Sequence, residues 1–160
     1  MTEMDMFVQG WDREFATTLK VLRAFPETKL DLKPAAPSKN ARDLAWTLVG
    51  QEHFLDQVVK GQVNPGGPPA PSTMSEIIST YETAHREMLP KLRKMSEADF
   101  REPIKFFTGP RQMGDVPRGQ VLWLVLMDSI QHRGQFSVYL RMAGGKLPSI
   151  YGPTADEPWM

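Results

Sequence analysis

The feature that most constrains this chain is a helical spacing of apolar residues that recurs in four long segments. In each segment apolar side chains return every three or four residues, which places them on one face of an α-helix. The segments cover residues 4–25, 40–60, 73–95 and 117–142. Four amphipathic helices in one chain bury their faces against one another, so the spacing predicts an all-α four-helix bundle.

Prolines and glycines separate these four segments. Residues 26–39 hold three prolines, and residues 61–72 hold three glycines and four prolines. Such composition interrupts helices and central strands, so both stretches are predicted to be surface connections. Residues 96–116 are irregular and turn-rich, and the β-prone Ile104 and Phe106 predict a short extended segment or hairpin there.

The length and charge of the chain exclude several classes of protein. The 160 residues predict a single domain over 1–160. The 19 basic and 19 acidic residues cancel, which argues against a nucleic-acid-binding or polybasic membrane-surface protein. No apolar run is long enough to span a membrane. Because the start lacks the regions of a signal peptide and no cysteine is present, we expect a cytoplasmic protein.

The last helical segment carries polar residues inside a nearly continuous apolar stretch: Asp128, Gln131, His132 and Gln135. Asp128 and His132 are four residues apart, so they share one helical face. Such a carboxylate–imidazole pair can bind one divalent metal, with Zn, Ni, Fe or Mn as candidates. The two side chains can also hydrogen-bond to each other. Such a bond either orients the imidazole as a base or only pairs two polar groups in the core.

The second and third helical segments offer further candidate ligands. Gln51 and Glu52 lie on or beside the apolar stripe of residues 40–60, with Thr47 one turn earlier. Glu52 is the best metal ligand of these. Its carboxylate can equally lie at the edge of the apolar stripe, where it is solvated or ion-paired. His85 takes a core-facing position and is either a satisfied core histidine or a third-helix ligand. His53 falls on the polar face and is predicted to be exposed.

Arg133 and Gly134 also call for an explanation, because glycine within a helix costs about 1 kcal/mol relative to alanine. We expect another backbone to approach Gly134 closely. We expect Arg133 to bridge to a carboxylate from a neighbouring helix or a dimer partner.

Three stretches resemble the DinB-like (DinB/YfiT) superfamily, and together they extend the resemblance over nearly the whole chain. They are DSIQHRGQFSVYLRMAGGKLPSIYGP from Asp128, ARDLAWTLVGQEHFL, and the opening WDREFATTLKVLRAFPETKLDLKP. The resemblance implies crossed-over helix order, a homodimer and a divalent metal held by three histidines. At the matching positions this chain has Thr47, Asp128 and His132, so one histidine of three is retained. Active relatives resemble thiol S-transferases or metal-dependent hydrolases.

Three functional hypotheses follow. The first is a metal-dependent thiol S-transferase or hydrolase that uses Asp128 and His132. The second is a metal-free protein that binds a small molecule or acts in the stress response without chemistry, with a pocket that draws on Thr47, Gln51, Asp128, Gln131, His132 and Gln135. The third is a structural homodimer whose apolar faces are its function. We favour a dimeric bundle of unassigned activity, whose functional location is the degenerate site on the second and fourth helical segments.

Overall fold

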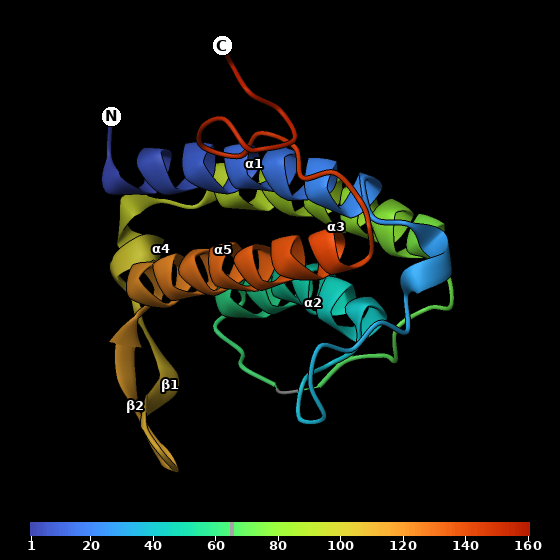
Figure 1. Cartoon of the computed structure of the whole chain (residues 1–160). Helices are drawn as coiled ribbons and strands as arrows, with labels where there is room; N and C mark the ends of the chain where they lie inside the picture. Colours follow the sequence, from blue (N-terminus) through green and yellow to red (C-terminus); the bar gives the residue numbers. More distant parts are fainter. Residues whose placement is uncertain (65) are drawn as a thin grey trace.

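The long helices lie where the apolar spacing predicts them. The computed structural model describes residues 1–64 and 66–160, which are mostly helical with a small antiparallel sheet (Figure 1). The four long helices are α1 (Glu3–Arg23), α2 (Ala41–Val59), α3 (Met74–Lys94) and α5 (Arg118–Met142). Each begins and ends within two residues of its predicted bounds.

Short elements fill the segments between these helices. They are a 3-10 turn η1 (Glu27–Lys29), the helix α4 (Glu97–Arg101), and the strands β1 (Pro103–Gly109) and β2 (Gln112–Pro117). The two strands pair antiparallel and form the hairpin predicted between residues 96 and 116. The expectation of an all-α fold is therefore corrected to a mostly helical fold with a two-stranded sheet. The apolar spacing does not predict α4, a five-residue helix that opens with a Ser96–Asp99 capping box.

Side-chain caps fix where most of the helices begin. Asn40 accepts a hydrogen bond from the Asp43 backbone N–H at 2.8 Å and caps α2. Thr73 does the same for α3 through the backbone N–H of Glu76. Each such cap satisfies one of the backbone donors that a helix N-terminus leaves unpaired, which is worth about 1 kcal/mol.

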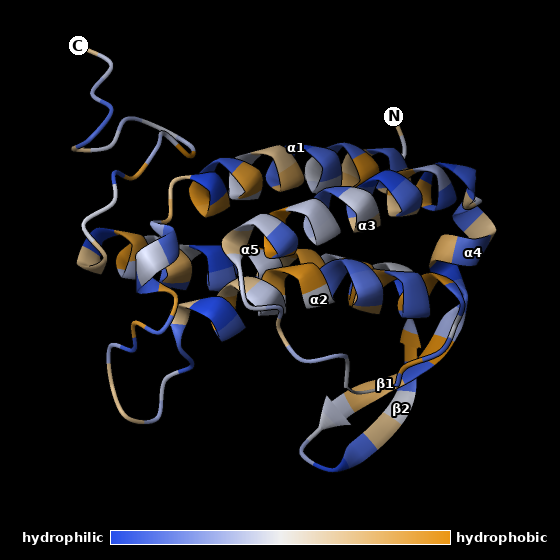
Figure 2. Ribbon diagram, turned by 90° about the vertical axis from the view of Figure 1, so that its right-hand side faces the viewer, coloured by the Kyte–Doolittle hydropathy of each residue, from blue (hydrophilic) through white to orange (hydrophobic). Residues whose placement is uncertain are grey.

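Each of the four long helices packs mainly on two of the other three. α1 packs on α3 and α5, and α2 packs on the same two helices. Figure 2 shows hydrophilic and hydrophobic residues interleaved along α1, α2 and α3, as expected of helices with one face in a core. Two apolar clusters result, one around Leu22, Leu48 and Phe136 and the other around Phe7 and Leu122. No helix among the described residues combines the length and apolarity needed to cross a bilayer.

The two expectations for Arg133 and Gly134 have opposite outcomes. Arg133 is 2% exposed, and its guanidinium donates to Glu14 of α1 at 2.5 Å and to the Tyr151 hydroxyl at 2.5 Å. The predicted bridge to a carboxylate from a neighbouring helix is thus confirmed. The prediction for Gly134 was wrong within the described chain, because no atom there lies within 4 Å of the position that a Cβ would take. Gly134 lies instead on the exposed side of α5.

Candidate functional site

A cleft of about 870 Å³ runs along α2 and is bounded by α5 and by the connection that follows α2. Its apolar wall includes Trp46 and Phe54 of α2 and Leu124 of α5. The Trp46 indole N–H donates to the Pro68 carbonyl at 2.7 Å, which fastens the proline-rich connection beside the cleft. A cleft of this size, with an apolar wall and a few polar groups, is typical of a small-molecule site.

The polar side of the cleft joins α2 to α5. The Gln51 amide N–H donates to Asp128 Oδ2 at 2.6 Å. His132 Nδ1 lies 2.8 Å from the backbone carbonyl oxygen of Asp128 and 3.3 Å from Oδ2 of the same residue. Because a carbonyl oxygen can only accept, Nδ1 carries the hydrogen. The lone pair of the neutral imidazole is therefore on Nε2.

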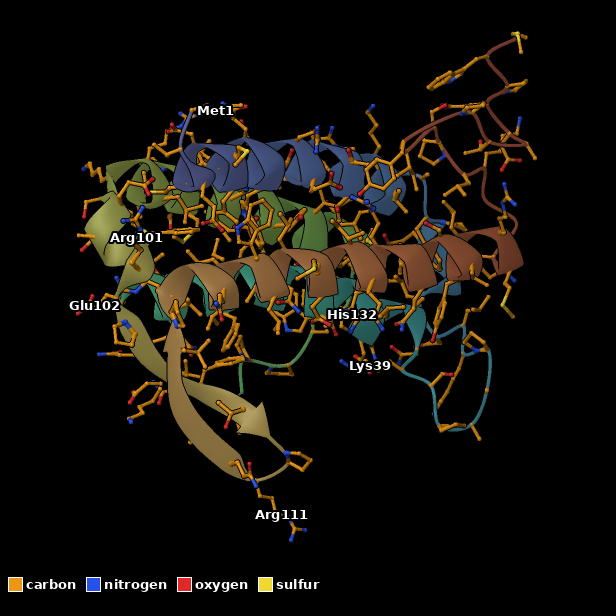
Figure 3. The ribbon with its side chains drawn as sticks, turned by 90° about the vertical axis from the view of Figure 1, so that its left-hand side faces the viewer. Met1, Lys39, Arg101, Glu102, Arg111 and His132 are labelled. Carbon is orange, nitrogen blue, oxygen red and sulfur yellow. The ribbon has the colours of Figure 1, made fainter. Side chains whose placement is uncertain are left out.

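A lysine from the connection ahead of α2 completes this region. Lys39 Nζ donates to Thr47 Oγ1 at 2.7 Å, and the Thr47 hydroxyl donates to the Asp43 carbonyl at 2.9 Å. Figure 3 shows Lys39 on the same side of α5 as His132. Lys39 lines both the large cleft and a second cavity of about 490 Å³, which His132 and Gln135 also line. Lys39 is not among the site residues predicted from the sequence, because it lies outside the helical pattern.

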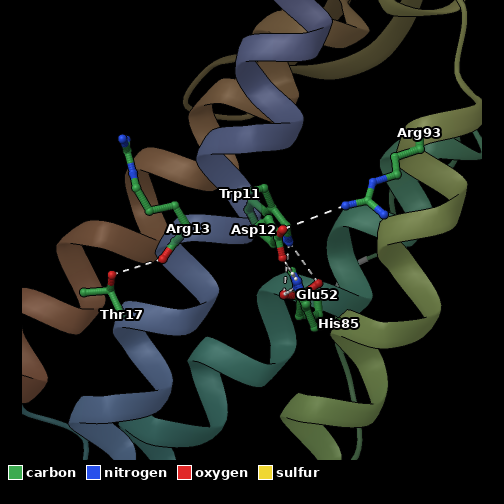
Figure 4. Close-up of polar contacts among 7 residues, drawn as sticks. All are labelled: Trp11, Asp12, Arg13, Thr17, Glu52, His85 and Arg93. Carbon is green, nitrogen blue, oxygen red and sulfur yellow. Dashed lines mark hydrogen bonds and ion pairs between the residues drawn. The ribbon is translucent and has the colours of Figure 1, made fainter.

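The structure places Glu52 and His85 in a different, buried set of contacts (Figure 4). Glu52 is 2% exposed, so the solvated alternative was wrong, whereas the ion-paired alternative agrees with its contact with His85. Both of its carboxylate oxygens accept from the Trp11 indole N–H, at 3.0 and 3.1 Å, and Oε1 lies 2.9 Å from His85 Nδ1. These partners come from α1 and α3, whereas Gln51 reaches Asp128 on α5.

His85 is held at both of its ring nitrogens. Nε2 lies 3.0 Å from Asp12 Oδ1, and the Phe15 ring stacks on the imidazole with centroids 3.7 Å apart. Burial lowers the pKa of His85, but the hydrogen bonds and negative charges of Glu52 and Asp12 outweigh it and leave the pKa raised. His85 thus has the contacts of a core histidine with both nitrogens satisfied.

The remaining predicted residues occupy separate places. Gln135 lines the second cavity, whereas Gln131 is exposed and belongs to the lining of neither cavity. His53 is exposed, as the sequence predicts. The structure thus brings Gln51, Asp128 and His132 together and separates them from Glu52 and His85.

The donor groups at the predicted metal positions do not fit a divalent cation. Among the described residues, no group of three or more His, Cys, Asp or Glu side chains is placed to hold a metal ion. Thr47, Asp128 and His132 supply one carboxylate and one imidazole, and the third group is a hydroxyl that accepts from the Lys39 ammonium. Two protein ligands are fewer than metal sites of this type use.

Comparisons with known proteins agree on one family. The model of the DinB family matches residues 1–159. The chain is 26% identical over 157 residues to a protein called Uncharacterized protein YrdA from Bacillus subtilis (strain 168), with 96% of this chain and 91% of YrdA covered.

Two solved structures share the fold. A DinB-like protein from Bacillus cereus ATCC 10987 matches with a TM-score of 0.77 and 22% identity, over 91% of this chain and 95% of the other. The DinB-like protein YjoA from Bacillus subtilis matches with a TM-score of 0.73 and 19% identity, over 97% of this chain and 99% of the other. At these identities the likeness establishes the fold alone.

Proposed function

This chain belongs to the DinB family, and from the chemistry of its cleft we propose that it binds a small aromatic amine without a metal ion. One observation carries the proposal: an aromatic cleft wall meets a half-exposed carboxylate. Asp128 is 39% exposed, and its Oδ2 is held by Gln51. Among the described residues, Oδ1 has no hydrogen-bond donor and is open to a ligand.

The charges that line the cleft favour a cation over an anion. Asp43 and Asp128 supply two carboxylates, and Lys39 supplies one ammonium. The Lys39 ammonium is turned to Thr47 by its hydrogen bond. Trp46 and Phe54 offer π-faces, which stack on an aromatic ligand and attract a positive charge. A ligand with an aromatic body and one protonated amine matches these groups.

A matched pair of probes tests the proposal. Isothermal titration calorimetry compares 2-naphthylmethylamine with 2-naphthoate, which share a ring system and differ in the sign of the charge. We expect one-site binding of the amine, tighter than the acid by about fivefold, the ~1 kcal/mol of a partly exposed ion pair. Asp128→Asn removes that preference, whereas Asp31→Asn, on the exposed connection, leaves it unchanged.

Three results would overturn this proposal. They are no saturable heat with the amine, equal affinity for the two probes, and an equal effect of the Asp128 and Asp31 substitutions. A zinc titration tests the metal-dependent alternative. Stoichiometric zinc binding that His132→Ala abolishes would contradict metal-independent binding and favour a transferase or hydrolase.

We also infer that the long helices form a four-helix bundle with crossed-over order. In a simple up-and-down bundle, helices consecutive in the chain are neighbours around the ring. Here α1 packs mainly on α3 and α5 rather than on α2, which supports at least one crossover connection.

A second proposal, a homodimer, has its own support on the outer face of α5. Met127 and Val138 are 60% and 58% exposed, and the most exposed positions between residues 120 and 138 are uncharged, with the partly exposed Asp128 among them. Uncovered apolar area of this kind marks interaction sites. Light scattering at micromolar concentration should give a dimer that Met127→Glu converts to a monomer, whereas Met6→Glu on α1 does not. A monomeric wild-type protein would refute it.

A further inference from the structure

The second cavity, of about 490 Å³, lies between α5 and the connection ahead of α2. Its polar lining includes Lys39, His132 and Gln135, and no acidic side chain belongs to it. The two cavities share Lys39 but differ in charge, because only the large cleft is lined by carboxylates. An electron-rich group such as a carbonyl oxygen is therefore better suited to this cavity than a cation.

The hydrogen bonds of His132 fix which nitrogen is basic. Nδ1 donates to the Asp128 backbone carbonyl at 2.8 Å, with the Asp128 carboxylate 3.3 Å away. Nε2 then carries the lone pair, and among the described residues it has no hydrogen-bond partner. The side chain is 20% exposed, so it is held in place yet reachable from the cavity. A base must offer its lone pair in this way to take a proton from water.

Lys39 adds a positive charge to the cavity lining that it shares with His132. The Tyr139 hydroxyl donates to the Lys39 carbonyl at 2.9 Å, which ties the backbone of Lys39 to α5. The Lys39 ammonium has three N–H donors, and one of them is used by Thr47. The others are free, within the described structure, to donate to an oxygen that develops negative charge.

We propose that this cavity hydrolyses small carboxylic esters, with His132 as the general base and Lys39 as the partner of the oxyanion. Water attacks the acyl carbon and passes one proton to His132 Nε2, while the carbonyl oxygen becomes an oxyanion beside the Lys39 ammonium. The intermediate then expels the alkoxide or phenoxide, which takes the proton back from Nε2. The products are a carboxylic acid and an alcohol or phenol, and no metal or redox partner takes part. This activity goes beyond amine binding in the large cleft and does not depend on it.

The test uses the full chain, p-nitrophenyl acetate in large excess, and a metal chelator. We expect repeated turnover, and general-base catalysis predicts a loss of about 100-fold when Nε2 is removed. His132→Asn is the key variant, because the asparagine amide can still donate where Nδ1 does while the base is gone. His53→Asn is the matched control on an exposed histidine and should keep the rate within about twofold. Lys39→Met should lower kcat by about 100-fold, the lower end of the loss that follows removal of one oxyanion partner.

Several outcomes would overturn the ester proposal. They are a wild-type rate equal to that of the same concentration of imidazole, one acetylation per chain without turnover, and activity that the chelator removes. Equal losses in the two histidine variants would do the same. Because naphthylmethylamine binding is measured separately, either proposal can fail while the other stands. Thermal unfolding of His132→Asn shows whether a lost rate reflects lost folding.

Discussion

Two polar clusters start from adjacent positions of α2, Gln51 and Glu52, and they differ in how completely their groups are paired. The buried cluster consists of Trp11, Glu52 and His85, with the half-exposed Asp12 at its edge. The cleft cluster consists of Lys39, Thr47, Gln51, Asp128 and His132. In the buried cluster, both ring nitrogens of the histidine and both oxygens of Glu52 have partners. In the cleft cluster, one carboxylate oxygen, one imidazole nitrogen and two ammonium hydrogens have none among the described residues.

This difference separates a stabilising role from a binding role. A buried polar group costs free energy unless it is hydrogen bonded, so the buried cluster must be complete for the protein to fold. Polar groups beside a cavity can hydrogen-bond to water or to a ligand, so the lack of a protein partner costs them little free energy. Gln51 and Glu52 are neighbours in sequence yet serve the two clusters, so substitutions at these two positions compare the clusters directly.

The largest effect is expected for Glu52→Ala. It leaves the Trp11 indole N–H and the His85 imidazole without their buried acceptor, and breaking a buried ion pair from one side costs about 3–5 kcal/mol. Urea unfolding measures the change. A loss below about 1 kcal/mol would mean that the buried cluster does not hold α1, α2 and α3 together.

A smaller effect is expected for Trp11→Phe. The aromatic packing against Phe7 is largely kept, while the N–H that donates to both Glu52 oxygens is lost. A hydrogen bond to a charged group contributes about 1.5–3 kcal/mol, which sets the expected loss in the same urea experiment. In Glu52→Ala the same tryptophan substitution should cost clearly less, because the acceptor is already gone. Additive losses would contradict a direct Trp11–Glu52 interaction.

The sequence predicts the long helices well and the two clusters poorly, for a physical reason. Helix bounds depend on local spacing and caps such as Asn40, which one segment contains by itself. Gln51 and Glu52 both border the apolar stripe, and only the packing of α1 and α3 decides which of them is buried. The Trp11–Glu52 bond joins residues 41 positions apart, and Lys39 reaches Thr47 from a proline-rich connection without periodicity. Contacts of this kind arise from tertiary packing.

The next effect is a pH dependence of stability that comes from His85. Its pKa is raised in the folded protein above the ordinary value of 6.5, because the nearby Glu52 and Asp12 carboxylates favour the charged imidazole. A raised folded-state pKa stabilises the fold fully below pH 6.5, and this contribution is lost as the pH rises through the folded value. The free energy of unfolding should therefore fall on the alkaline side of pH 6.5.

Variants at two histidines test this assignment. His85→Gln should remove the decline in unfolding free energy above pH 6.5, whereas His53→Gln, at an exposed position, should keep it. A decline that persists in His85→Gln would place the responsible proton elsewhere.

The smallest effect on stability is expected for Gln51→Ala, which is the counterpart of Glu52→Ala in the cleft cluster. The substitution removes the amide that donates to Asp128 at 2.6 Å, but water can reach the half-exposed carboxylate and replace that donor. The loss of unfolding free energy should then be about 0.5–1 kcal/mol, the net value of an ordinary hydrogen bond. The same variant frees a second carboxylate oxygen for the ligand, so it should bind 2-naphthylmethylamine at least as tightly as the wild type. A loss of stability as large as that of Glu52→Ala would show that the cleft cluster holds the fold in the way the buried cluster does.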